Sequence, residues 1–576
     1  MKIVWKYIKN YKVQAVLGPL FKMLEASFEL IVPIVMANMI DIGIRNHDMT
    51  YIWRSGAILV ALGLLGLICS VTAQYFAAKA AVGFGTELRK DLFEHITGMT
   101  YSNLDRAGTA SLITRMSSDL NQLQSGVNFG LRLFLRSPFI VVGALIMAFT
   151  ISVKVAWIFV VAVVVLTVVI VGIMQITIPL YKKVQNALDQ VLLSTRENLI
   201  GIRVVRAFCM QKKEQEEFSE KSNALLTLQT LVGRLSQLMN PTTYVIVNVA
   251  TIAIVWQGGK EVYFGNLTQG EVIALVNYMS QILLALIVMA NLIVTFTKAL
   301  ASAGRIKDVF EIQPDMQDGT EVLGDAAEWI AFEHVSMRYS GAKEETISGI
   351  DFAVKKGETV GIIGGTGAGK STLVQLIPRF YDVVSGAVKI AGKNVKEYKI
   401  EELRKKIGIV PQKAVLFKGS IRDNLKFGNE NATDEEIYRA LEIAQALEVV
   451  ERKPGKLDFE IRQGGMNLSG GQRQRLTIAR ALVKQPEILI LDDSASALDY
   501  ATDAKLRKAL KECTDHMTVF LVSQRAASIQ HADQILVLDD GEMVGIGRHE
   551  TLLETCEVYR EICHSQFAKG EVKGRV

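Results

Sequence analysis

Long apolar runs separated by charged stretches dominate the first half of the chain. Crossing about 30 Å of hydrocarbon takes roughly 20 helical residues, and six segments approach this length: residues 15–40, 56–76, 134–152, 156–178, 242–264 and 272–297. Beyond about residue 300 short apolar runs alternate with glycine turns and charges. The pattern predicts an all-α membrane domain of six spans over 1–310, a linker over 311–328 and a soluble domain over 329–576.

The segments between the spans alternate in length and charge. Short connectors lie near 45–54, 152–155 and 258–270, whereas the long loops, 77–133 and 180–240, carry most of the Lys and Arg. The positive-inside rule therefore places the long loops and both termini in the cytoplasm. Helical periodicity in these loops predicts that the spans continue as helices well beyond the membrane.

Three ionisable residues share one face of the first span: Lys22, Glu25 and Glu29. Charge inside a membrane is costly and usually faces a partner or a cavity. Two interpretations stay open, namely a local Lys22–Glu25 pair that orients the helix, or an acidic patch that lines a cavity and favours cationic cargo.

Net charge and cysteine content narrow the class of protein. The formal charge of +5 over 576 residues is small and not gathered into one patch, so we expect no nucleic-acid partner. Five cysteines without a C-x-x-C pair indicate reduced thiols: Cys69, Cys209, Cys513, Cys556 and Cys563. The basic, aromatic N-terminus has no pattern of a cleavable signal peptide.

A glycine-rich loop follows an apolar strand predicted over 359–364 and precedes an apolar helix. This context is the one a P-loop requires, because its backbone N–H groups surround phosphates at a helix N-terminus. Lys370 then contacts the terminal phosphates of ATP, and Ser371 holds Mg²⁺. The predicted ATP-binding residues are Gly364, Gly365, Thr366, Gly367, Ala368, Gly369, Lys370, Ser371 and Thr372.

A buried strand over 487–491 ends in Asp492, which suits a Walker B carboxylate that orients Mg²⁺. Between the P-loop and this strand, a basic helical stretch follows the sequence Leu468-Ser469-Gly470-Gly471-Gln472. The order of P-loop, Gln412 after an apolar strand, this signature, the Walker B strand and Asp499 resembles the ATP-binding cassette (ABC) transporters. Residues 197–208 and 105–119 likewise resemble the two cytoplasmic loops of ABC exporters with six spans per half.

The resemblance implies a fold and roles for several residues. The soluble domain becomes an α/β P-loop NTPase of RecA-like type with a helical subdomain. Tyr339 stacks on adenine, Gln412 reaches Mg²⁺, and Asp499 lies at a dimer seam. The loop tips at 104–111 and 208–214 act as coupling helices. ATP is held between one P-loop and the partner's signature, so a second cassette is required. The nucleotide bound to that cassette is contacted by Ser469, Gly470, Gly471 and Gln472.

Three positions depart from the family pattern. Asp493 follows the Walker B Asp where the family has Glu, and a carboxylate withdrawn by about 1 Å can cost on the order of 100-fold in rate. Gln524 replaces a His after the strand 518–523 and carries no positive charge. Before the signature, Gln463-Gly464-Gly465 replaces the usual Glu-Arg-Gly.

These departures beside an intact signature resemble the degenerate-site subunit of heterodimeric, multidrug-type ABC exporters. A partner half-transporter then supplies the catalytic Glu and His, and the predicted cargo is an amphipathic, drug-like or lipid-like molecule exported by alternating access across a bacterial plasma membrane. Two alternatives are a homodimeric exporter with Asp493 as base and a poorly hydrolysing, ATP-gated regulator or channel. A soluble enzyme is excluded by the spans, and an importer or a leader-processing peptide exporter is disfavoured.

Overall fold

A computed structural model describes residues 2–321, 329–494, 496–513 and 517–566, so part of the predicted linker, 322–328, lies outside it. The chain forms two compact units. The first contains residues 1–97 and 110–312, and the second contains residues 98–109 and 313–576. Sequence patterning assigned 98–109 to the membrane half, but this loop tip packs with the soluble half because its side chains bond and stack there, as described below.

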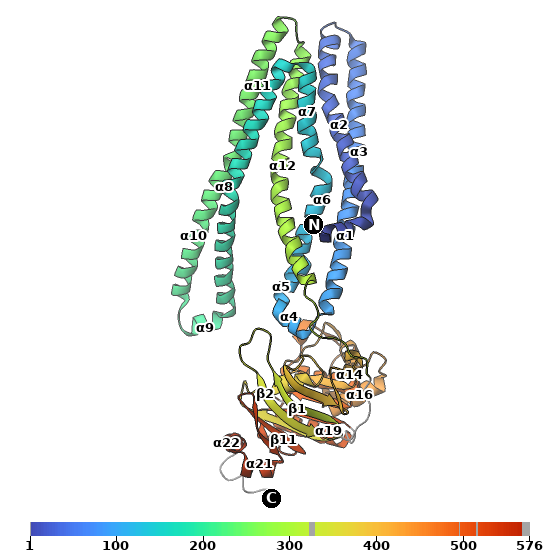
Figure 1. Ribbon diagram of the computed structural model, residues 1–576, viewed down its shortest axis with the longest axis vertical. Coiled ribbons are helices and arrows are strands. Elements are labelled where there is room, and N and C mark those ends of the chain that lie inside the picture. Colours follow the sequence, from blue (N-terminus) through green and yellow to red (C-terminus); the bar gives the residue numbers. More distant parts are fainter. Residues whose placement is uncertain (1, 322–328, 495, 514–516, 567–576) are drawn as a thin grey trace. The chain divides into compact units, whose positions relative to one another are not determined.

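The first unit is all-helical (Figure 1). Its helices are α1 Lys2–Ile8, α2 Lys12–Asn38, α3 Met49–Thr97, α5 Thr109–Thr114, α6 Leu120–Leu133, α7 Arg136–Ile151, α8 Val153–Ile200, α9 Ile202–Ala207, α10 Gln211–Gln237, α11 Met239–Tyr263 and α12 Gln269–Phe310, with a 3₁₀ turn over Lys9–Tyr11 and π-helical turns over Met39–Ile44 and Arg115–Asp119.

Six helical stretches of this unit are long and apolar enough to cross a membrane, with lengths of 41 to 53 residues. Each covers one of the predicted spans to within one residue, so the chain is a multi-pass integral membrane protein with six spans. A helix of 48 residues such as α8 is about 72 Å long at 1.5 Å per residue, more than twice the hydrocarbon thickness. The predicted helical extension of the spans beyond the membrane is confirmed.

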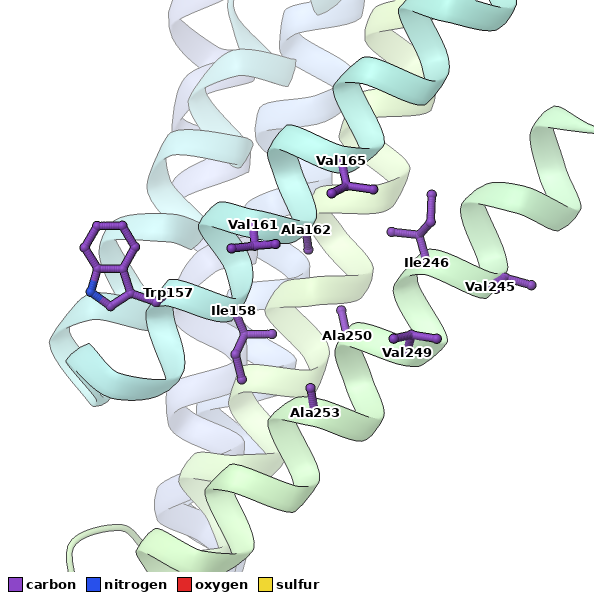
Figure 2. Close-up of a pocket in the computed structure, with 10 residues that line it drawn as sticks. All are labelled: Trp157, Ile158, Val161, Ala162, Val165, Val245, Ile246, Val249, Ala250 and Ala253. Atoms are coloured by element: carbon purple, nitrogen blue, oxygen red, sulfur yellow. The ribbon is translucent and has the colours of Figure 1, made fainter.

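Small residues allow the membrane helices to pack closely. In α3, Ala73, Ala77 and Ala80 are fully buried, and a Cβ placed on Gly18 of α2 lies only 3.5 Å from the Ala77 nitrogen. Because lipid supplies no hydrophobic drive between helices, such close backbone approach contributes much of their association. Helices α8 and α11 leave an apolar pocket of about 510 Å³ between them, lined by residues such as Trp157, Val161 and Val249 (Figure 2).

The second unit is α/β. Its strands are β1 Ile330–Met337, β2 Ile347–Val354, β3 Thr359–Gly364, β4 Ser385–Ile390, β5 Lys393–Asn394, β6 Ile407–Val410, β7 Gly419–Ser420, β8 Glu460–Ile461, β9 Ile488–Asp492, β10 Thr518–Val522, β11 Gln534–Asp539 and β12 Glu542–Gly547. Its helices are α4 Tyr101–Ala107, α13 Lys370–Leu376, α14 Ile400–Lys405, α15 Ile421–Lys426, α16 Asp434–Ile443, α17 Leu447–Glu451, α18 Gly470–Val483, α19 Tyr500–Cys513, α20 Ala526–Ile529, α21 His549–Thr555 and α22 Glu557–Gln566. Short 3₁₀ turns lie at Lys456–Asp458 and Gln463–Gly465.

A six-stranded sheet forms the centre of this unit, in the order β12-β11-β3-β10-β9-β6. All neighbours are parallel except the edge pair β11 and β12. Every residue of β9 and β10 is buried, as expected for parallel strands covered on both faces. A separate antiparallel sheet has the order β2-β1-β4-β5. The predicted fold class, a six-helix membrane domain followed by an α/β P-loop cassette, is confirmed.

Candidate functional site

Four neighbouring parallel strands carry the predicted nucleotide residues at their carboxyl ends. Strand β3 leads into the P-loop, β9 ends at Asp492, β10 is followed by Gln524, and β6 is followed by Gln412. In the sheet, Val522 pairs with Asp492 on one side and with Ile362 on the other. Because these strands run parallel, their ends meet at one edge, where open α/β sheets bind ligands.

Two glycines give the P-loop its backbone shape. Gly367 and Gly369 have φ values of +91° and +87°, a region that side chains with a Cβ rarely adopt. A Cβ on Gly369 would also lie 2.5 Å from Cγ2 of Ile347. Gly369 is the N-cap of α13, so the loop delivers its N–H groups to a helix N-terminus, where phosphate is favoured.

The buried ammonium of Lys370 lies inside this loop. Its Nζ donates to the carbonyls of Gly364 at 2.9 Å and Gly365 at 2.5 Å. Burial lowers the pKa of Lys370, since no bulk water solvates the charge there. The loop thus holds a preformed cation that suits a triphosphate.

Ser371 and Asp492 are two of the residues predicted to hold Mg²⁺. The Ser371 hydroxyl donates to Oδ1 of Asp492 at 2.8 Å, and Asp492 is 5% exposed. Burial raises the pKa of Asp492, and the Ser371 hydrogen bond opposes this. A hydroxyl beside a carboxylate is the oxygen donor set that Mg²⁺ prefers, so the residues fit the ion that accompanies ATP.

Asp493 lies at the position of the expected catalytic acid. Its φ of +44° is unusual for a residue with a side chain. Its Oδ2 accepts a long hydrogen bond of 3.4 Å from Nε2 of Gln412, so the structure brings these two predicted residues together. Burial raises the pKa of Asp493, while the Gln412 contact and the Lys370 charge lower it.

Gln524 is exposed in the loop between β10 and α20, and two residues that sequence reasoning missed lie beside it. Arg525 lowers the pKa of Asp493 electrostatically and sits 4.7 Å from the ring centroid of Tyr500. The sequence signal for Arg525 was a cationic residue directly after Gln524. Gln566 of α22 donates to the Gln524 carbonyl at 2.7 Å and accepts from the Ala526 N–H at 2.8 Å; no sequence pattern indicated this contact.

Tyr339 follows β1 and packs against the P-loop helix. Its hydroxyl lies 3.1 Å from Oγ1 of Thr372, and its ring contacts that of Tyr381 edge-on, with centroids 5.0 Å apart. The half-buried ring therefore lies beside the P-loop helix, and its stacking on adenine stays a prediction.

The tip of the first long loop belongs to the same neighbourhood. Tyr381 donates to Oδ2 of Asp105 at 2.6 Å, and Tyr101 of α4 stacks on Phe380 with centroids 4.3 Å apart. A continuous set of contacts thus joins α4 to Tyr381 and Tyr339. The second loop tip, 208–214, belongs to the first unit, and its coupling role stays a prediction.

The signature residues begin α18 and lie partly at the surface. Ser469 is the N-cap: its hydroxyl accepts from the Gln472 N–H at 3.3 Å, and the Gln472 side chain accepts from the Ser469 N–H at 3.1 Å. Ser469 and Gly470 are exposed, and Gly471 is half-buried. This capping box presents the helix N-terminus to a ligand or partner outside the helix.

The backbone conformation before the signature explains why two glycines occur there. Gly464 and Gly465 have φ values of +67° and +68°, so the departure from the family sequence coincides with a left-handed turn. Arg473 holds this turn by donating to the carbonyls of Leu468 at 2.8 Å and Gly465 at 3.3 Å. Asp499, the predicted seam residue, caps α19 by accepting from the Thr502 N–H at 2.9 Å.

The carboxylates of the first span both have cationic partners. Lys22 donates to Glu25 at 2.5 Å, as in the local-pair interpretation. Arg136 of α7 donates to both oxygens of Glu29, at 2.7 and 2.8 Å. Glu25 and Glu29 also line a cavity of about 480 Å³, but their charge is compensated there.

Comparisons with known proteins cover both units. Residues 16–286 match the family described as ABC transporter transmembrane region, and residues 347–496 match the family described as ABC transporter. The chain is 35% identical over 569 residues to the uncharacterised ABC transporter ATP-binding protein YfiB of Bacillus subtilis (strain 168), covering 99% of each protein. It is 31% identical to an ATP-dependent lipid A-core flippase of Desulfotalea psychrophila, over 92% of this chain and 93% of that protein.

A solved structure shares the overall architecture. The structure of a bacterial Atm1-family ABC exporter with ATP bound has a TM-score of 0.79 to this chain, covering 98% of this chain and 99% of that one. At 23% sequence identity the similarity concerns the fold.

Proposed function

This chain belongs to the ABC transporters, and we propose that it is the degenerate-site subunit of a heterodimeric exporter of amphipathic, drug-like or lipid-like molecules. The chain is an ABC half-transporter whose cassette binds ATP for transport, and half-transporters of this family form dimers. The heterodimer, the weak site and the cargo class are the parts that we propose.

One observation carries the proposal: this cassette combines Asp493 and Gln524, both departures from the family pattern, with an intact signature. Asp493 contacts Gln412 only at 3.4 Å, and Gln524 brings an uncharged amide where a histidine is expected. By contrast, Ser469 and Gln472 form a complete capping box at an exposed helix end. We infer that this chain hydrolyses ATP poorly on its own edge and supplies its signature to the partner's site.

Within this cassette, different residues bind phosphate, hold Mg²⁺ and orient water. Lys370 and the N–H groups at the start of α13 bind phosphate, and Ser371 and Asp492 would hold Mg²⁺, which neutralises phosphate charge when bound. Asp493 orients water less well than a glutamate, because its carboxylate is one methylene closer to the backbone. Closure of two such cassettes moves the loop tips, among them α4, and reorients the spans toward the outside.

Support for an amphipathic cargo comes from two sources. A relative that covers nearly the whole chain is named a lipid A-core flippase, and the membrane unit contains apolar pockets such as the one in Figure 2. The compensated charges of Glu25 and Glu29 give no support to a preference for cations.

A homodimeric exporter is the second candidate, and one feature favours it. Arg525 places a positive charge near Asp493, which could replace part of the charge that the histidine supplies. In that case Asp493 would act as the base in two identical sites.

The deciding experiment measures the ATPase rate of the purified chain in lipid, alone and co-purified with a half-transporter that has Glu and His at the two positions. We expect near-background hydrolysis alone and clear activity in the mixed dimer. Ser469→Ala in this chain should lower the mixed activity at least tenfold, because the partner's site loses a phosphate-binding hydroxyl and the capped helix end.

Thr433→Ala serves as the matched control, since Thr433 is exposed and, like Ser469, begins a helix with a capping box, but on α16. Brisk turnover by the chain alone would replace the heterodimer with the homodimer. Activity that survives Ser469→Ala would contradict the proposed role of the signature.

A further inference from the structure

The membrane unit has a second cavity besides the pocket of Figure 2. It lies between α8, α12 and the junction of α10 with α11. It has a volume of about 750 Å³, and its lining includes Met174, Thr177 and Lys182 of α8 and Val294 and Lys298 of α12. On α12 the lining residues Asn291, Val294 and Lys298 follow a helical spacing, so one face of the helix forms the wall.

The cavity is amphipathic along its length. With the first residues of α8 and α12 at the outer headgroups, Ile173 and Ala290 lie about 30 Å along at 1.5 Å per residue, still within the hydrocarbon. Lys182 and Lys298 each lie about 44 Å along, the depth of a bilayer with both headgroup layers. The apolar end therefore falls in the predicted inner leaflet, and the lysines fall at its headgroups.

The polar end carries positive charge without compensation in the described part of the chain. No carboxylate there lies within ion-pair distance of Lys182 or Lys298, and none lines the cavity. The nearest acid along α8, Asp189, accepts from Gln185 at 3.0 Å. Hydroxyl donors add to the cationic end, since Tyr181 and Ser236 also line it with their oxygens 3.4 Å apart.

The other cavities of this unit differ in charge. The pocket of Figure 2 has no charged residue in its lining. The cavity near Glu25 and Glu29 is acidic, but each carboxylate has its own cation. Only the α8–α12 cavity, among those described here, combines apolar walls with unpaired cations.

We infer that the α8–α12 cavity binds an anionic amphipathic molecule of the inner leaflet, with a phosphate or carboxylate between Lys182 and Lys298 and its chain toward Met174 and Val294. The inference rests on the proposed export function and deepens it by naming the charge of the cargo. A lysine near a membrane surface favours an anionic group by an amount that corresponds to roughly fivefold in affinity.

The test uses the complex of this chain with its partner in discs of neutral phosphatidylcholine. Equilibrium binding is measured for three single-chain probes with the same tail: lysophosphatidic acid, lysophosphatidylcholine and an alkyltrimethylammonium. The variant Lys182→Gln/Lys298→Gln is compared with Lys183→Gln, the adjacent exposed lysine that does not line the cavity. Glycerol 3-phosphate, which has the headgroup but no tail, is added as a competitor.

We expect lysophosphatidic acid to bind more than tenfold tighter than the other probes. The double variant should remove this preference, and Lys183→Gln should retain it. Binding that ignores probe charge, or that the double variant leaves unchanged, would overturn the inference. Competition by glycerol 3-phosphate as effective as that by lysophosphatidic acid would also overturn it, in favour of a site for free anions.

ATPase stimulation by the same probes separates the two proposals. If neutral or cationic amphipaths stimulate hydrolysis and anionic ones do not, the cavity inference fails while the exporter proposal stands. If no amphipath of any charge stimulates the complex, the proposed cargo class itself fails.

Discussion

Two side chains, Asp493 and Gln524, stand at the positions that we propose limit ATP hydrolysis in this cassette. Both lie where neighbouring parallel strands end, so their positions follow from the strand pattern. Their effect on chemistry depends on distances of about 1 Å. Asp493 reaches Gln412 at 3.4 Å, and one added methylene would extend its carboxylate toward the space where water attacks.

We therefore expect Asp493→Glu combined with Gln524→His to raise the ATPase rate of the chain alone by roughly 10- to 100-fold. The measurement is phosphate release by the purified chain in lipid. Adding Lys370→Ala should abolish the gain, because the buried ammonium of the P-loop is lost. An unchanged rate in the double variant would show that a feature other than these two side chains limits hydrolysis.

At the scale of elements, α22 holds the loop that carries Gln524. Tyr559 and Cys563 of this helix are fully buried in the core, so α22 is fixed in place. Its last described residue, Gln566, then bonds both the Gln524 carbonyl and the Ala526 N–H. The helix thereby restrains the backbone on either side of Arg525.

Replacing this amide should loosen the loop without unfolding the cassette. A lost hydrogen bond is worth about 1 kcal/mol, so Gln566→Ala should speed hydrogen exchange of the Ala526 amide roughly fivefold. Gln566→Glu is the control, since its carboxylate can still accept from Ala526 and should keep that amide protected. Exchange mass spectrometry over 523–529 makes the comparison. Equal exchange in all three proteins would mean that the hydrogen bonds of Gln566 do not form in solution.

At the scale of the whole molecule, ion pairs far apart in sequence join the membrane helices. The Glu29–Arg136 pair links α2 to α7, and the Arg136 side chain is 19% exposed. Removing one member of such a pair leaves a charge without its partner in a poorly solvated region, which costs more than removing both.

We expect Glu29→Gln to destabilise the protein by roughly 1–3 kcal/mol, because it leaves the mostly buried Arg136 without its partner, and Glu29→Gln/Arg136→Gln to destabilise it less. Thermal unfolding in one detergent measures both. Lys307→Gln is the reference, because it removes a partner from an exposed pair with Glu311 and should leave stability almost unchanged. A double variant at least as unstable as Glu29→Gln would show that the pair adds no such penalty.

The sequence alone determined the features that local patterns encode. Runs of apolar residues nearly long enough to cross the hydrocarbon identified six spans, and glycines before Lys370 identified a P-loop whose left-handed backbone only glycine adopts readily. A continuous apolar strand followed by Asp492 indicated where the acids would lie. These features depend on near neighbours in the chain, so a pattern of a few residues is enough to specify them.

Only the tertiary structure decided which distant residues meet. The partner of Glu29 is 107 positions away. The residue that bonds the Gln524 carbonyl is 42 positions away, and Asp105 meets Tyr381 across 276 positions. The cationic cavity likewise combines Lys182 and Lys298 from separate helices. Such contacts depend on how helices and strands pack, and no local periodicity records which faces will be opposed or which charges will remain unpaired.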